Sequence, residues 1–207
     1  MRRLVTPGES VPRETRKNDY VYYDNESPYS TILGFYDDDK NEVIPLEGTW
    51  KPRIGDSVIG IVSGISKTEL YTINLTDFVR GIIAPTRFES QRFAMGDVIE
   101  ATVEDVERKR IAVLSRPRKL ANGRLVSVKP VRIPRIIGRN DTMIEQISRF
   151  TNTMVRVGRN GIIWLSGGNI GVAIEMIKLV EKEAHTHGLT ERIRRELESR
   201  KSADGHL

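Results

Sequence analysis

The sequence predicts a mixed β and α+β protein of three small modules, and three observations support this prediction. Short apolar runs separated by turn-forming residues fill the first half of the chain, as is typical of small β domains. Apolar positions at helical spacing begin at Ile144. Between these regions, residues 108–139 hold eleven Lys or Arg residues and no Asp or Glu. The predicted modules span 1–49, 50–118 and 119–201, followed by a tail at 202–207.

The charge of the chain is segregated. The 207 residues include 33 basic and 28 acidic ones, a net charge of +5, but outside residues 108–139 there are 22 basic and 28 acidic residues, a net charge of −6. A long segment of one sign attracts a polyanion, and the usual cellular polyanions are nucleic acids. The alternative is a solvated strand face or linker, which basic runs often form.

Composition excludes several classes of site. The chain has no cysteine, which rules out disulfides, thiolate zinc sites and cysteine nucleophiles. We see no apolar stretch of membrane-spanning or signal-peptide length, so a soluble protein of the cytoplasm is expected. The three histidines, His185, His187 and His206, all lie late in the chain, and we expect no metal and no cofactor.

The first module, residues 1–49, is predicted to be a small β domain. Residues 37–41, Asp-Asp-Asp-Lys-Asn, separate two apolar runs and predict a β-hairpin with a charged, solvated turn. The three aspartates lack the alternating ligand spacing of a calcium loop. Four tyrosines suit a protein contact as well as a core, and the sequence leaves both open: Tyr20, Tyr22, Tyr23 and Tyr29.

The second module is predicted to be a closed five-stranded barrel. Two matching phrases, at 54–59 and 95–99, each place a Gly-Asp turn before alternating apolar residues. Further runs follow at 71–75, 78–83 and 111–114, with no long helix among them. Five short strands in this order favour an OB fold.

OB barrels bind single-stranded nucleic acid by combining a basic groove with aromatic rings on which bases stack. The stacking candidates are Tyr71, Phe78, Phe88 and Phe93, although each could equally be core, and Phe78 is assigned to the core because it leads an apolar run. The candidate RNA-binding residues of the chain are Lys67, Tyr71, Arg80, Arg87, Arg92, Arg108, Lys109, Arg110, Arg132, Arg135 and Arg139.

The third module shows the order of a eukaryotic-type KH domain: strand, helix, loop, helix, strand, strand, helix. Strands are predicted at 125–128, 153–157 and 162–166, and a long helix at 169–187. In a KH domain an Ile-Gly-x-x-Gly loop joins two helices and lets the backbone approach about four nucleotides.

That loop is incomplete here, because Asp141 replaces its last glycine. A carboxylate and a phosphate 4 Å apart repel by roughly 4 kcal/mol at an effective dielectric of about 20, which argues against a phosphate clamp. Asp141 or Thr142 is instead expected to cap the following helix, with Glu145 at capping-box spacing.

The turn at 158–161, Gly-Arg-Asn-Gly, predicts a hairpin between the last two strands, because Asn-Gly is a strong hairpin signal. Gly158, Asn160 and Gly161 are therefore assigned a structural role that needs no ligand.

Several phrases together resemble a known family, the archaeal exosome RNA-binding cap subunit, which is related to eukaryotic ribosomal-RNA-processing cap proteins. The phrases are VTPGE at 5–9, VIPL at 43–46, GDSVIG at 55–60, IPRIIG at 133–138, GRNG at 158–161 and EAHTHGLTERI at 183–193.

The resemblance implies a noncatalytic subunit, three copies of which cap a hexameric ring of phosphorolytic RNase PH-like subunits, possibly mixed with the other cap subunit. It further implies that the N-terminal module docks on the ring, that the S-one-type OB folds surround the entry pore, and that the KH domains promote binding of single-stranded RNA with adenine-rich tails. Residues 71–96 are short for an OB fold of this type.

Other interpretations remain. An S-one/KH factor of transcription elongation or translation has similar modules, although the bacterial antitermination type carries two KH copies and only one is visible here. Polynucleotide phosphorylase places the modules in the opposite order, after catalytic domains. A metal site of His185 and His187 with Glu181 or Glu183 is disfavoured, because residues i and i+2 of a helix point about 200° apart.

Overall fold

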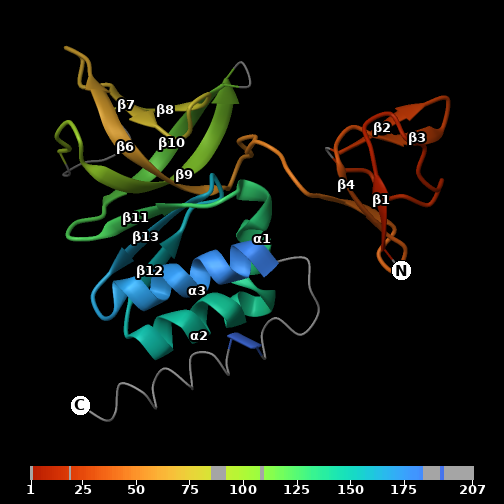
Figure 1. Ribbon diagram of the computed structural model, residues 1–207. Coiled ribbons are helices and arrows are strands. Elements are labelled where there is room, and N and C mark those ends of the chain that lie inside the picture. The colour runs from red at the N-terminus through yellow and green to blue at the C-terminus, as the bar shows by residue number, and fades with distance from the viewer. Residues whose placement is uncertain (1, 19, 85–91, 108–109, 184–191, 194–207) are drawn as a thin grey trace, which may run out of the picture. The chain divides into compact units, whose positions relative to one another are not determined.

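The computed structural model describes residues 2–18, 20–84, 92–107, 110–183 and 192–193. The chain divides into two compact units, Met1–Thr49 and Trp50–Leu207 (Figure 1). Within the described ranges, no helix is long and apolar enough to cross a membrane.

A three-stranded antiparallel sheet in the order β1-β4-β5 forms the centre of the first unit. Its strands are β1 (Arg2–Val5), β4 (Gly34–Asp37) and β5 (Glu42–Pro45). β4 and β5 form the predicted hairpin, with Asp37 opposite Glu42. The core of the unit is small and consists of Val5, Val11, Tyr36 and Val43.

Asp37 lies in the charged turn but is buried, whereas Asp38 and Asp39 are exposed. Arg2 donates from Nε to Oδ2 of Asp37 at 2.9 Å. Burial raises the pKa of Asp37, but the hydrogen bond and charge of Arg2, together with the Asp39 N–H and the charge of Lys40, hold this pKa below its usual value. The prediction of a solvated turn is confirmed for Asp38 and Asp39 and wrong for Asp37.

A second hairpin joins β2 (Val21–Asp24) to β3 (Ser27–Ser30). Asn25 and Glu26 connect them with φ angles of +43° and +67°, as a tight two-residue turn requires. The sequence did not reveal β3, because its segment contains Pro28 between polar residues.

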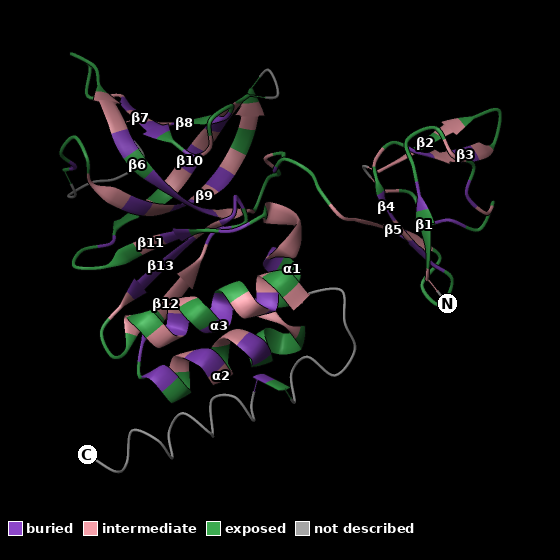
Figure 2. Cartoon of the chain, in the orientation of Figure 1, coloured by how far each residue is buried: buried purple, intermediate pink, exposed green. Residues whose placement is uncertain are grey.

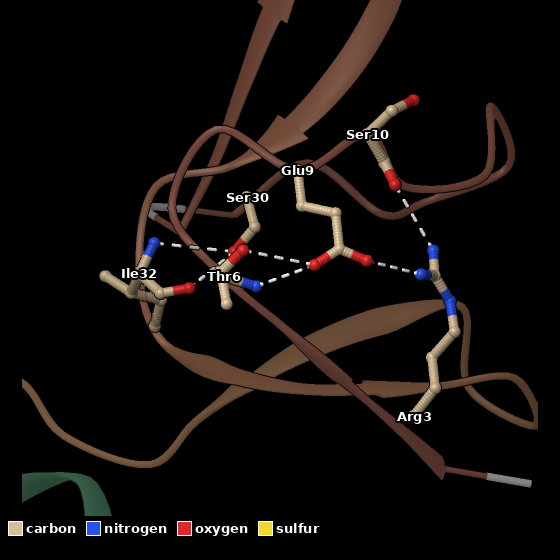
Figure 3. Close-up of polar contacts among 6 residues, drawn as sticks. All are labelled: Arg3, Thr6, Glu9, Ser10, Ser30 and Ile32. Carbon is tan, nitrogen blue, oxygen red and sulfur yellow. Dashed lines mark hydrogen bonds and ion pairs between the residues drawn. The ribbon is translucent and has the colours of Figure 1, made fainter.

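The phrase at 5–9 builds the turn that follows β1. Glu9 accepts hydrogen bonds from the backbone N–H of Thr6 at 2.9 Å and from its hydroxyl at 3.3 Å, and it pairs with Arg3 at 2.7 Å (Figure 3). The Thr6 N–H bond, aided by Arg3, holds the pKa of Glu9 below its ordinary value. Residues 5–9, one of the phrases that resemble the family, therefore stabilise a local turn.

The second unit begins with a closed barrel of five strands in the order β10-β8-β7-β6-β9, which confirms the prediction. The strands are β6 (Ser57–Ile65), β7 (Tyr71–Asn74), β8 (Arg80–Ile83), β9 (Val98–Glu107) and β10 (Ile111–Lys119). β10 closes the barrel by pairing parallel to β8 and antiparallel to β9.

The two Gly-Asp phrases form similar turns before β6 and β9. Gly55 and Gly96 have φ angles of +90° and +85°, which favour glycine. Asp56 accepts from the Trp50 indole N–H at 2.9 Å, and Asp97 accepts from a backbone N–H at 2.9 Å. Each aspartate thus closes the turn that starts its strand.

The rest of the second unit has the predicted KH order. A three-stranded sheet, β11-β13-β12, contains β11 (Arg124–Ser127), β12 (Met154–Val157) and β13 (Ile162–Ser166). The helices are η2 (Pro130–Arg132), α1 (Ile133–Ile137), η3 (Arg139–Asp141), α2 (Thr142–Thr151) and α3 (Ile170–Glu183).

The helices α1, α2 and α3 lie on one side of this sheet and the barrel lies on the other (Figure 1). Buried positions recur along α2 and α3 and face the sheet, while exposed ones face outward (Figure 2). Ile136, Ile147, Ile163 and Ile177 are fully buried in the shared core. The predicted continuation of α3 to residue 187 lies outside the described residues.

Candidate nucleic-acid interface

The hairpin between β12 and β13 joins the KH domain to the barrel. Asn160 is 3% exposed and donates from Nδ2 to the carbonyl oxygens of Ile59 at 2.8 Å and Leu75 at 2.7 Å. Its Oδ1 accepts from the N–H of Ile59 at 3.2 Å. One buried amide at the tip of a KH hairpin therefore bonds both β6 and the residue that follows β7 in the barrel.

Gly158 and Gly161, to which the sequence analysis assigns a structural role, lie in this hairpin and allow close packing. A Cβ on Gly158 would lie 2.9 Å from the backbone nitrogen of Ile59, and one on Gly161 would lie 2.5 Å from the carbonyl oxygen of Val128. Beside the hairpin, Ile59, Leu120 and Trp164 form an apolar cluster between β6 and the KH sheet. The barrel and the KH domain are thus packed together as one body.

The turn from β7 to β8 brings an aromatic ring to the surface. Phe78 is 67% exposed, whereas its neighbour Val79 is buried. The assignment of Phe78 to the core is wrong: Phe78 lies in the turn before β8 and is exposed, whereas the next residue, Val79, belongs to the barrel core. The backbone N–H of Arg80 donates to the carbonyl of Arg110 at 3.0 Å, so two exposed arginines start adjacent strands here.

Tyr71 and Phe93 occupy the barrel core. They are 3% and 5% exposed, and their rings meet edge to face with centroids 5.5 Å apart. The assignment of Tyr71 as a stacking residue is therefore corrected, since the inward face of β7 buries both sides of its ring. Phe88 lies outside the described residues.

Acidic partners neutralise part of the basic segment. Arg118 pairs with Glu100 at 2.6 Å, and Lys119 pairs with Asp97 at 2.8 Å. The Lys119 hydrogen bond lowers the pKa of Asp97. Because β9 pairs with β10, Glu100 in β9 and Asp97 just before it meet basic residues at the end of β10. Inspection of residues 108–139 alone could not show these partners.

Arg92 is also paired. Its guanidinium contacts the Glu69 carboxylate, and this hydrogen bond raises the pKa of Arg92. Lys67, in the same β6–β7 connection as Glu69, is exposed. Among the candidates and the basic segment, the described exposed side chains without an ion pair include Lys67, Arg80, Arg110, Arg116, Arg124 and Arg139. Arg87, Arg108 and Lys109 lie outside those ranges.

Three residues of the KH loop have positive φ angles, a conformation that glycine adopts most easily. Gly138 has a φ of +80°, and Asn140 and Asp141 follow with +50° and +61°. Asp141 makes no side-chain hydrogen bond at the start of α2, and the Thr142 hydroxyl donates back to the carbonyl of Arg139 at 2.8 Å. The predicted side-chain cap by Asp141 or Thr142 is wrong, since the Thr142 hydroxyl bonds the loop and the Asp141 carboxylate does not cap the helix.

The remaining KH candidates lie before and within that loop. Arg135 and Arg139 are exposed in α1 and η3, and Arg132 is half-buried at the end of η2. The backbone N–H of Lys129, just before η2, donates to Glu181 at 2.6 Å. RNA contacts by Arg132, Arg135 and Arg139 therefore stay a prediction.

Glu181 and Glu183 have basic partners. Glu181 also pairs with Lys178 at 2.9 Å, and Glu183 pairs with Arg192 at 2.5 Å. His185 and His187, the other residues of the disfavoured metal site, lie outside the described residues.

Similarity to known proteins agrees with this architecture. No family model matches the chain. Exosome complex component Rrp4 of Picrophilus torridus is 34% identical, with 99% of this chain and 96% of that protein covered. Rrp4 of Pyrococcus abyssi is 36% identical, with 96% and 83% covered. A crystal structure of a protein assigned as an exosome complex RNA-binding protein matches with a TM-score of 0.67 and 25% identity, over 76% of this chain and 99% of its own. The chain belongs to the archaeal Rrp4 family of exosome complex components.

Proposed function

We propose that this chain is a noncatalytic subunit of an exosome in the cytoplasm. It holds single-stranded RNA on its barrel and KH domain and passes the strand to a phosphorolytic ring for 3′-to-5′ degradation. Three copies, alone or mixed with the other cap subunit, would cap the hexameric ring, and adenine-rich tails would be favoured.

One observation carries the RNA-binding part of the proposal. Asn160 joins two folds that commonly bind single strands, so exposed arginines at the barrel, such as Arg80 and Arg110, and at the KH loop, such as Arg139, belong to one body. A strand that contacts both modules would then bind without the cost of ordering them first. Family membership favours this function over transcription elongation or translation.

The N-terminal unit supports a docking role. Leu4, Phe35 and Ile44 lie opposite one another across the sheet, on the face away from Val5 and Tyr36. Leu4 is 53% exposed, and nearby Leu33 is 41% exposed. Apolar residues on both faces are typical of a sheet that is covered on both faces. We infer that the second face binds the ring.

RNA binding is tested by measuring the affinity of the purified chain for a single-stranded RNA at several salt concentrations. The logarithm of the affinity should fall with a slope of about −0.7 for each phosphate neutralised. No measurable binding at low salt would refute the proposal. Degradation of RNA by the purified chain with phosphate, and without any partner, would refute the noncatalytic role.

Docking is tested by co-purification with ring subunits. Leu4→Ser should weaken co-purification and leave RNA affinity unchanged, while Tyr22→Ser, on the exposed β2–β3 hairpin, should alter neither. Deletion of residues 1–48 should abolish co-purification. If the deletion variant still co-purifies fully, the docking role is wrong.

A further inference from the structure

We propose that the Phe78 ring is a stacking platform for one RNA base, with Arg80 and Arg110 binding the adjoining phosphates. The proposal rests on the proposed RNA-binding function and adds a specific subsite to it. Within the described part of the chain, Phe78 is the most exposed aromatic ring, at 67%. An exposed aromatic side chain forgoes about 1.5–3 kcal/mol of burial, and a base stacked on the ring would recover part of it.

The turn that carries Phe78 is held firmly. The Thr76 hydroxyl accepts from the N–H groups of Phe78 at 3.3 Å and Val79 at 3.0 Å. The Val79 carbonyl accepts from Leu75 and Thr76 at 3.3 and 3.2 Å. A ring on such a turn loses little freedom when a base stacks on it, which favours binding.

The KH hairpin holds the same turn from the other side. The carbonyl of Leu75, where the turn begins, accepts a 2.7 Å hydrogen bond from Asn160. Because Asn160 is buried, this bond is shielded from water. The turn that carries Phe78 is therefore attached at its first residue to the KH hairpin.

The surroundings of the ring suit a nucleic acid. Phe78 lies in the turn and Arg80 is the first residue of β8; both are exposed, on either side of the buried Val79, and the Arg80 N–H donates to the Arg110 carbonyl. Asn74 lies opposite Arg80 on β7 and is exposed, which adds an amide able to bond a base edge. An aromatic ring flanked by arginines and an amide is the composition of single-strand binding surfaces.

Acidic residues nearby provide an internal control. Asp77 is exposed beside Phe78, and Glu107 lies opposite Ile111 across β9 and β10. Asp77→Asn removes a charge that repels phosphate, so it should raise RNA affinity while leaving the ring in place.

The test compares full-length variants for binding to oligoadenylate and to an abasic oligonucleotide of equal length. Phe78→Ala should weaken binding to oligoadenylate about 5- to 150-fold, the range that corresponds to the usual stacking contribution. Phe78→Tyr should bind within about twofold of the natural chain, since its ring also stacks. On the abasic strand, Phe78→Ala and the natural chain should bind alike.

Salt dependence separates the roles of the three side chains. Arg80→Ala and Arg110→Ala should each reduce the salt slope by about 0.7, whereas Phe78→Ala should leave it unchanged. Met154→Ala, which alters an exposed apolar residue of β12, should have no effect. If the natural chain binds RNA and Phe78→Ala binds oligoadenylate equally well, or loses equal affinity for both strands, the stacking site is refuted. Failure of the natural chain to bind any RNA would refute the proposed function instead.

Discussion

Replacement of Asp141 by glycine should make the KH loop bind RNA more tightly. Asp141 is exposed and its φ of +61° is a conformation that glycine adopts freely. Relief of backbone strain is worth about 1 kcal/mol, but the freer unfolded chain of the glycine variant costs about 0.4–1 kcal/mol. The free energy of unfolding should therefore stay within about 1 kcal/mol of that of the natural chain.

RNA affinity should change more than stability. A unit charge 4 Å from a phosphate contributes about 1 kcal/mol in water and about 4 kcal/mol at an effective dielectric of 20, and an exposed loop lies near the first value. Asp141→Gly should thus raise RNA affinity about fivefold or more at low salt, and the gain should shrink as salt rises. Fluorescence anisotropy with a labelled single strand measures both.

The control for Asp141→Gly is Asp141→Asn, which removes the charge, keeps the side-chain volume and tolerates a positive φ. If charge repulsion is the cause, both variants should bind RNA more tightly. An increase for glycine alone would indicate that backbone freedom matters more. Unchanged affinity in both variants at low salt would refute the argument that Asp141 repels a bound phosphate.

Three further predictions concern stability. Asn160→Ala should lower the free energy of unfolding by about 2–4 kcal/mol, because it leaves buried backbone groups of the barrel unpaired, and urea unfolding measures the loss; a loss under 1 kcal/mol would contradict it. Arg2 lowers the pKa of Asp37, so the pair should stabilise the first unit fully above about pH 4. This stabilisation should decrease as the pH falls through the folded-state pKa of Asp37. Hydrogen exchange of β1 and β4 should show this acid dependence in the natural chain and not in Asp37→Asn. Gly81→Ala should destabilise the barrel by about 1–3 kcal/mol, since its Cβ would lie 2.4 Å from a β10 side chain. Gly171→Ala in α3 should stabilise the chain by about 0.5–1 kcal/mol. A melting temperature that shifts in the same direction in both variants would be inconsistent with the packing.

The strand and helix order was readable from the sequence because local signals agreed. Gly-Asp turns preceded β6 and β9, Asn-Gly marked the last hairpin, and Ile144 and Ile147 marked α2. Each of these signals acts over a few residues. The hairpin β2–β3 was only half visible, since its second strand has no apolar alternation.

The side-chain partners were less predictable because they come from distant parts of the chain. Asn160 was recognised as a turn former, but its bonds to the barrel span 101 and 85 residues of sequence. Arg118 and Lys119 meet Glu100 and Asp97 only through the pairing of β9 with β10. Phe78 was assigned to the core because it leads an apolar run, whereas it lies in the turn before β8.

The atoms that Asn160 bonds have a consequence for how this protein tolerates change. All three belong to the main chain of Ile59 and Leu75, so the attachment does not depend on which side chains those positions carry. Substitutions along the outer surface of the barrel can therefore alter which RNA is bound, and how tightly, without weakening the attachment of the barrel to the KH domain.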